Sequence, residues 1–140
     1  LGLAANLEIK PAQGHDVETG RVVGRRLASL GVDDRPALLL SSFSADALEA
    51  AMEDVDDIPR GWLAGAFDAA ALKTASRLGC ASIHLALDGL EAAHVVAARA
   101  AGLEVLVYTV NRLADARRLA SWGVGGLFTD RPDLLLDTIR

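Results

Sequence analysis

The chain has 140 residues, about the length of one ordinary domain, and 51% of them are hydrophobic, which is enough for a sizeable core. Its formal net charge is −5, and the Lys and Arg residues form no basic stripe, so nucleic acid is not the expected partner. No apolar run approaches the roughly 20 residues that a membrane span needs. The single cysteine, Cys80, cannot form an internal disulfide, and we expect a cytoplasmic protein. Residues 1–140 are expected to form one domain.

Short β-type blocks alternate with helical ones along the chain. The predicted strands are Leu3 to Lys10, Ala37 to Phe43, Gly61 to Gly65, Ala81 to Leu85, Val105 to Val110 and Gly126 to Thr129. The predicted helices are Asp16 to Leu30, Ala45 to Val55, Asp68 to Leu78, Gly89 to Ala101, Leu113 to Trp122 and Pro132 to Ile139. Most helices are followed by Gly in "SLGV", "RLGC", "AAGL" or "SWGV", which predicts a left-handed helix end there.

This alternation predicts an α/β fold with a parallel sheet. Strands such as "ALLLSSF" and "EVLVYTV" are nearly continuous apolar runs, typical of strands that are covered on both faces. Two architectures fit the pattern: an open doubly wound sheet, or a TIM (βα)8 barrel of which this chain carries about six βα units. No G-x-G-x-x-G motif follows a strand, so the nucleotide-binding form of the open sheet has no support. The barrel is the favoured interpretation.

The first predicted strand carries two charges in an apolar setting. Glu8 and Lys10 are two residues apart, so on a strand their side chains leave the same face. An interior ion pair is one explanation. Burial of a charge is costly unless it is paired or bound to a metal, so the stretch is also a candidate site.

Polar side chains gather at the carboxyl ends of the predicted strands, where a barrel has its active site. A rim of carboxylate, ammonium, imidazole, hydroxyl and amide groups suits a phosphate ester held by a hard divalent cation. The residues of this rim are Glu8, Lys10, Ser41, Ser42, Phe43, His84, Tyr108, Thr109, Asn111, Thr129 and Asp130.

Several of these residues have structural alternatives. Ser44 is expected to cap the helix that begins at Ala45, which leaves Ser42 for contact with substrate. Asn111 could instead cap the helix near Leu113. His84 could equally be a hydrogen-bonded residue of the barrel wall.

Three further residues are expected to have no catalytic role. His15 and His94 are interpreted as structural or solvated, since one lies in a loop and the other inside a predicted helix. Cys80 is expected to be buried and unreactive, because no base or cation is its neighbour in the sequence.

Four ordered motifs, "NLEIKP", "LLSSF", "YTVN" and "GLFTDRPD", resemble the successive strand motifs of the glycerophosphodiester phosphodiesterase family. "IPRGWL" and "RLGCASIHL" are further similar to its short cytosolic bacterial members. The resemblance runs from end to end of the chain. It implies a TIM barrel that hydrolyses glycerophosphodiesters to glycerol 3-phosphate and an alcohol, an activity of lipid and glycerol metabolism.

The resemblance also implies residue roles. Glu8 matches the family's ligand of a divalent metal, usually Mg or Ca, and Lys10 lies beside it as a partner for Glu8 and for substrate phosphate. Tyr108 matches an aromatic residue that borders the substrate. Ser42, Phe43, His84 and Asn111 complete the predicted substrate-binding set.

The family's His-Arg-Gly and Glu-x-Asp motifs and its second catalytic His do not occur in this sequence. By the family's order the chain would hold strands three to eight, with no residue of the catalytic His pair. We therefore expect the isolated chain to be inactive and to associate with a missing N-terminal segment or with itself. The alternative is a non-catalytic βα module that binds a phosphate-containing ligand or a partner.

Overall fold

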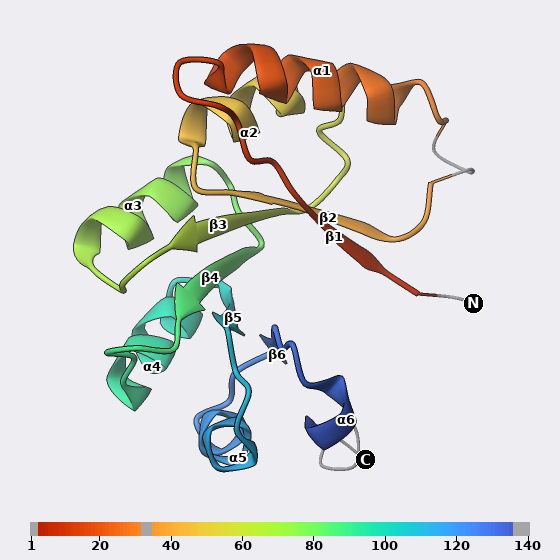
Figure 1. Ribbon diagram of the computed structural model, residues 1–140. Coiled ribbons are helices and arrows are strands. Elements are labelled where there is room, and N and C mark those ends of the chain that lie inside the picture. The colour runs from red at the N-terminus through yellow and green to blue at the C-terminus, as the bar shows by residue number, and fades with distance from the viewer. Residues whose placement is uncertain (1–2, 32–34, 136–140) are drawn as a thin grey trace. The chain divides into compact units, whose positions relative to one another are not determined.

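The computed structural model describes residues 3–31 and 35–135 (Figure 1). Strands and helices alternate throughout this part of the chain. The strands are β1 (Ala5–Glu8), β2 (Leu38–Ser42), β3 (Arg60–Ala64), β4 (Ser82–Ala86), β5 (Glu104–Tyr108) and β6 (Gly126–Leu127). The helices are α1 (Asp16–Ala28), α2 (Ala45–Met52), α3 (Ala69–Arg77), α4 (Ala92–Ala100), α5 (Leu113–Ser121) and α6 (Pro132–Leu135).

The predicted order of elements is confirmed, although most elements are a few residues shorter than expected. The remainder of the last predicted helix, residues 136–139, lies outside the described residues. The glycines after α1, α3, α4 and α5 have φ between 60° and 82°, which is the left-handed conformation predicted for them. These glycines are Gly31, Gly79, Gly102 and Gly123.

The contacts divide the chain into two compact units. The first comprises Leu1–Leu63 and Thr74–Cys80, and the second comprises Ala64–Lys73 and Ala81–Arg140. Whether residues 1–140 form a single domain stays a prediction.

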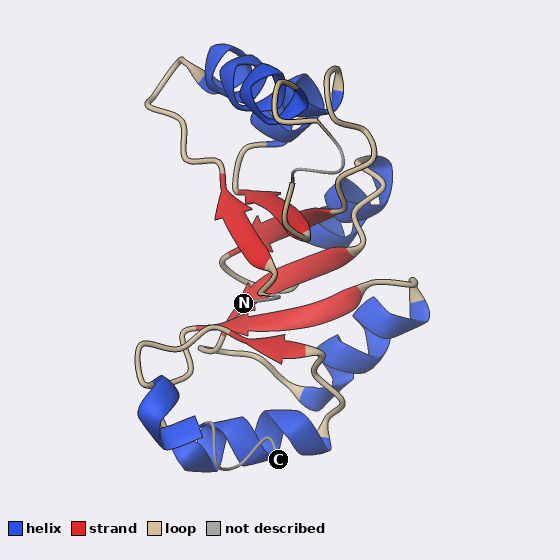
Figure 2. Ribbon diagram, turned by 90° about the vertical axis from the view of Figure 1, so that its right-hand side faces the viewer, coloured by secondary structure: helices blue, strands red, loops and turns tan. Residues whose placement is uncertain are grey.

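The strands of each unit pair in chain order and in parallel. In the first unit β2 lies between β1 and β3, with Leu7 opposite Leu40 and Ser42 opposite Trp62. In the second unit β5 lies between β4 and β6. In each unit the helices lie on one side of the strands (Figure 2). The predicted α/β class with parallel strands is therefore confirmed, and it is consistent with a partial TIM barrel.

Close packing of α1 on α2 depends on glycine. A Cβ atom added at Gly20 would clash with the carbonyl oxygen of Ala47, and one at Gly24 would lie 2.7 Å from that of Ala51. The two helices lie side by side in Figure 1. Small residues four apart on both helices thus allow their backbones to approach, and the sequence analysis did not anticipate this contact.

The two faces of β4 and β5 differ in their side chains. Ile83, Leu85, Val105 and Val107 are fully buried and alternate with the residues of the other face. That other face carries His84 beside Leu106 and Ala86 beside Tyr108. His84 and Tyr108 therefore share one face of this unit's sheet.

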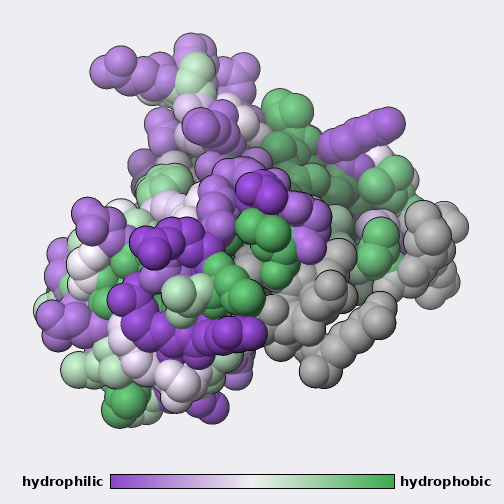
Figure 3. All heavy atoms as spheres, turned by 60° about the horizontal axis from the view of Figure 1, so that its bottom comes forward, coloured by the Kyte–Doolittle hydropathy of each residue, from purple (hydrophilic) through white to green (hydrophobic). Residues whose placement is uncertain are grey.

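Hydrophilic residues and small hydrophobic patches mix on the face shown in Figure 3. In the part of the chain that the structure describes, no helix is long and apolar enough to span a membrane.

Candidate functional site

Glu8 and Lys10 lie at the carboxyl end of β1, where both side chains are exposed and only Ile9 between them is buried. Within residues 3–31 and 35–135 no ion pair joins Glu8 to Lys10. The alternative of an interior ion pair between Glu8 and Lys10 is therefore wrong, and the proposed ligand role of Glu8 stays a prediction. Because both charges reach solvent, neither incurs the cost of burial that would require a partner.

A cavity of about 320 Å³ nevertheless brings these two residues together with the end of β2. Its lining includes Glu8, Lys10, Ser42 and Phe43, all predicted site residues, and also Asp16 from the start of α1. Phe43 is 53% exposed, which is unusual for a phenyl ring and leaves an apolar surface beside the charges. The cavity thus offers carboxylates, an ammonium and a phenyl ring. The functional roles of the lining residues remain predictions.

Ser42 and Ser44 organise the loop that forms one wall of this cavity. The buried Ser42 hydroxyl donates to the carbonyl oxygen of Ile9 at 2.6 Å and accepts from the Ser44 amide at 3.0 Å. Ser44 caps α2, as predicted, by accepting from the Ala47 amide, and its hydroxyl donates to Asp16 Oδ1 at 2.6 Å. These bonds fix the end of β2 against the loop that follows β1.

Asp16 was missed by the sequence analysis, which considered strand ends alone. An acidic residue at the first position of a helix that follows a site strand would have been the signal.

His84 is completely buried in the second unit. Its Nε2 lies 3.0 Å from Ser82 Oγ and its ring is tilted against Phe128, at 5.2 Å between centroids. Burial lowers its pKa from 6.5 to about 4, so the imidazole is neutral at pH 7. No described residue bonds to its Nδ1. These contacts favour the wall alternative for His84, and contact with substrate remains a prediction.

Tyr108 and Asn111 make contacts with neighbouring loops. The Tyr108 hydroxyl donates to the carbonyl oxygen of Ala64 at 2.9 Å. Asn111 Oδ1 accepts from the Thr129 hydroxyl and from the Asp130 amide, and its Nδ2 donates to Asp130 Oδ2. Asn111 therefore connects the loops that follow β5 and β6. The cap alternative for it is wrong, since Arg112 is the N-cap residue of α5.

A second cavity, of about 590 Å³, lies at the carboxyl ends of β4 and β5. Tyr108 and Thr109 line it together with Asp88 and Arg118, which the sequence analysis did not select. Asp88 follows β4 in the stretch "LALDGL", so its place after a strand was the available signal.

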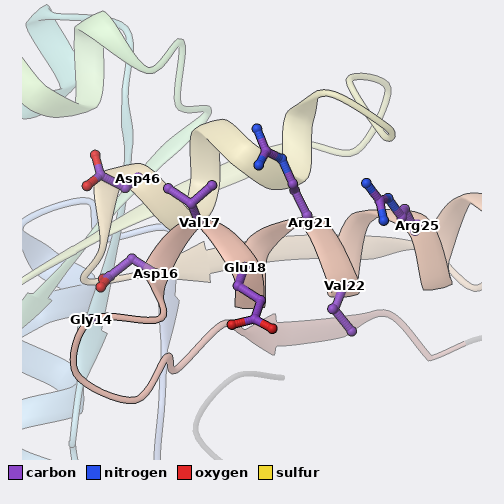
Figure 4. Close-up of a pocket in the computed structure, with 8 residues that line it drawn as sticks. All are labelled: Gly14, Asp16, Val17, Glu18, Arg21, Val22, Arg25 and Asp46. Carbon is purple, nitrogen blue, oxygen red and sulfur yellow. The ribbon is translucent and has the colours of Figure 1, made fainter.

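A third cavity, of about 690 Å³, lies along α1. It includes none of the predicted site residues. Figure 4 shows Arg21 and Glu18 leaving α1 on opposite sides, so these two charges do not converge. The cavities at the strand ends, which hold predicted site residues, are therefore the candidate sites.

The three residues expected to have no catalytic role lie on the surface, at a helix cap or in the core. His15 Nδ1 lies 3.0 Å from Glu18 Oε2 on the surface. His94 caps α4 by accepting from the Glu91 amide, and its ring stacks on Phe67. Cys80 is buried, and burial raises its pKa to about 11, which makes the thiolate scarce at neutral pH.

The donor set at the first cavity fits a hard cation only in part. Carboxylate oxygens are the ligands that Mg²⁺ and Ca²⁺ prefer, and Glu8 offers them with no competing ion pair from residues 3–31 or 35–135. Within the described residues no group of three or more His, Cys, Asp or Glu side chains could hold a metal. Glu8 can therefore supply one ligand, and other ligands must come from outside this set.

Residues 3–134 match the sequence model of the glycerophosphoryl diester phosphodiesterase family. A 36-residue stretch is 56% identical to a glycerophosphodiester phosphodiesterase of Bacillus subtilis (strain 168), covering 26% of this chain and 12% of that protein. The structure is similar to an Oleispira antarctica phosphodiesterase in complex with the product sn-glycerol-3-phosphate, with a TM-score of 0.89, 32% identity, and coverage of 99% of this chain and 56% of that one.

A Thermotoga maritima glycerophosphodiester phosphodiesterase, at 20% identity and a TM-score of 0.68, shares the fold over 96% of this chain and 57% of its own. The chain thus spans little more than half of these structures. The matched family model covers nearly the whole of the chain. The chain belongs to the glycerophosphoryl diester phosphodiesterase family.

Proposed function

We propose that the full-length protein carrying this chain hydrolyses glycerophosphodiesters to glycerol 3-phosphate and an alcohol. One observation carries the proposal. In this chain, which belongs to the family, the exposed carboxylate of Glu8 and the exposed ammonium of Lys10 line one cavity at the strand ends. The Oleispira antarctica relative, whose structure contains sn-glycerol-3-phosphate, supports the identity of the product.

Glu8 is proposed to ligate Mg²⁺ or Ca²⁺. When bound, such a cation neutralises phosphoryl charge and lowers the pKa of a coordinated oxygen. Lys10 stabilises negative charge on the phosphoryl oxygens. Phe43 offers an apolar contact for the glycerol carbons, while Ser42 holds the cavity wall through its bond to Ile9.

Substrate contacts in the second unit are proposed for Tyr108, His84 and Asn111. Tyr108 lines a cavity at the ends of β4 and β5. His84 shares its sheet face and remains neutral, so it can take part only through a hydrogen bond at physiological pH. Asn111 positions the loops after β5 and β6.

The isolated chain is proposed to be inactive and to supply strands three to eight of a closed TIM barrel. The sequence contains none of the family's catalytic His pair and no Glu-x-Asp motif. We propose that the complete protein is a cytoplasmic enzyme of lipid and glycerol metabolism, and that this chain pairs with an N-terminal segment or with itself.

A second candidate is a non-catalytic module that binds a phosphate-containing ligand. The absence of a three-ligand metal group among the described side chains favours it. Binding of phosphate without hydrolysis would be its signature.

Release of glycerol 3-phosphate from glycerophosphocholine tests the proposal. The full-length protein is expected to release it with Mg²⁺ or Ca²⁺ and to stop when a chelator is added. This 140-residue chain alone is expected to release none. Binding of glycerol 3-phosphate with no hydrolysis under any metal would support the binding module instead.

A further inference from the structure

The backbone next to Lys10 is held at both of its polar groups. The Ile9 amide donates to the carbonyl oxygen of Ser41 at 2.7 Å, and the Ile9 carbonyl oxygen accepts from the Ser42 hydroxyl at 2.6 Å. That carbonyl belongs to the peptide group that joins Ile9 to Lys10. Lys10 has no ion pair within residues 3–31 and 35–135, so its backbone position decides where its ammonium group can reach.

The Ser42 hydroxyl is in turn oriented by hydrogen bonds that end at Asp16. Its oxygen accepts from the Ser44 amide at 3.0 Å, and the Ser44 hydroxyl donates to Asp16 Oδ1 at 2.6 Å. Each hydroxyl has a single proton. Ser42 donates its proton to Ile9. Ser44 donates its proton to Asp16, so the direction of each bond in this network is fixed.

The last acceptor of the network is a carboxylate. Hydrogen bonds to a charged acceptor are shorter and roughly twice as strong as those between neutral groups, and the 2.6 Å bond from Ser44 to Asp16 has the length typical of them. Asp16 is the first residue of α1, whereas Ser44 is the N-cap residue of α2. Asp16 therefore ties together the loops that follow β1 and β2, and it lines the same cavity as Lys10.

We propose that Asp16 is a positioning residue for Lys10. Its part in catalysis rests on the proposed function. Asp16 acts by accepting the hydrogen bond of Ser44, and not through its negative charge. Loss of the acceptor releases the Ser44 hydroxyl and loosens the loop that orients Ser42. The Lys10 ammonium is then held less often where it stabilises a phosphoryl oxygen, and a small misplacement of such a group is costly.

The experiment measures kcat of the full-length protein for glycerophosphocholine. Asp16→Ala removes the acceptor and is expected to lower kcat roughly tenfold, the scale of losing a bond that orients a functional side chain. Asp16→Asn removes the charge but keeps an acceptor oxygen, so kcat is expected to stay within about threefold. Asp46→Ala removes a carboxylate from the first turn of α2, and this control is expected to leave kcat unaltered.

A double-mutant cycle tests whether Asp16 acts through Lys10. In a Lys10→Gln background Asp16→Ala is expected to lower kcat by a smaller factor, at most about threefold, because the ammonium that it positions is already gone. A residue that only stabilises the fold would lower kcat by the same factor in both backgrounds. Equal factors would therefore overturn the proposal. So would an unchanged kcat in Asp16→Ala, or equal losses in Asp16→Ala and Asp16→Asn.

If the unmodified full-length protein hydrolyses no diester, the proposed function fails. A titration with inorganic phosphate, followed by NMR, then decides the role of Asp16 separately. Weaker phosphate binding in Asp16→Ala but not in Asp16→Asn supports positioning of Lys10. Equal binding by the unmodified protein and both variants overturns it, as does the absence of phosphate binding to the unmodified protein.

Discussion

The end of β1 and the centre of β4 both carry ionisable groups that the sequence marks as candidate site residues, yet they lie in opposite environments. Glu8 and Lys10 are exposed charges around a cavity, without an ion pair between them. His84 is fully buried, in hydrogen-bond distance of Ser82, and has a pKa of about 4. Exposed charges are available to a ligand, whereas a buried neutral ring contributes mainly to the packing of its sheet.

Replacing Lys10 tests the role of the exposed charges and has an expected effect as large as that of any other substitution. Lys10→Gln in the full-length protein is expected to lower kcat by roughly 100-fold, since it removes a charge that would stabilise the transition state. Steady-state release of glycerol 3-phosphate measures the change. Lys73→Gln, at an exposed position on α3, is the matched control and should leave kcat unaltered. Equal rates in the two variants would remove Lys10 from the mechanism.

The pH dependence of stability tests whether His84 is buried and neutral. The folded-state pKa of His84 is lowered from 6.5 to about 4, so the unfolded chain binds more protons between these values. The contribution of His84 to the free energy of unfolding is therefore complete above pH 6.5. It is lost as the pH falls toward 4, by on the order of 3 kcal/mol at most. Urea unfolding of the full-length protein at a series of pH values measures this loss.

Two variants test whether the His84 imidazole causes the loss of stability between pH 6.5 and 4. His84→Leu is expected to flatten the dependence between pH 6.5 and 4. Ser82→Ala removes the neighbouring hydroxyl but keeps the buried ring, and its dependence is expected to remain. A slope that survives in His84→Leu would mean that other groups produce it.

The packing of α1 on α2 gives the smallest expected effect. Gly20→Ala is expected to lower the free energy of unfolding by about 1–3 kcal/mol, because its methyl group would clash with the carbonyl oxygen of Ala47. Gly65→Ala is the control, since a Cβ atom there meets nothing within 4 Å. Thermal unfolding compares the two variants. Equal melting temperatures would show that α1 can shift at little cost.

Much of the fold could be predicted from periodicity and glycine placement. The order of strands and helices and the left-handed helix ends at Gly31, Gly79, Gly102 and Gly123 are confirmed. Ser44 was recognised as a cap because a cap is a local signal. The predictable features are those that depend on residues close together in the chain.

What could not be predicted depends on which distant segments meet. The exposure of Glu8 and Lys10 follows from their place at the end of β1, whereas strand alternation alone suggested an interior pair. Asn111 resembled a helix cap, yet its bonds to Thr129 and Asp130 lie about 20 positions further along. Asp16 and Asp88 became candidates only when the cavities that they line were known.

Metal-dependent turnover of Glu8→Gln tests the central claim, that the Glu8 carboxylate binds the cation used in catalysis. Glycerol 3-phosphate release is measured for the full-length protein across a Mg²⁺ and a Ca²⁺ titration, with Glu18→Gln on α1 as the control for loss of one carboxylate. We predict that Glu8→Gln loses most of the metal-stimulated rate, by roughly 100-fold, and that Glu18→Gln keeps it. A Glu8→Gln variant with the unmodified rate and metal dependence would contradict the account.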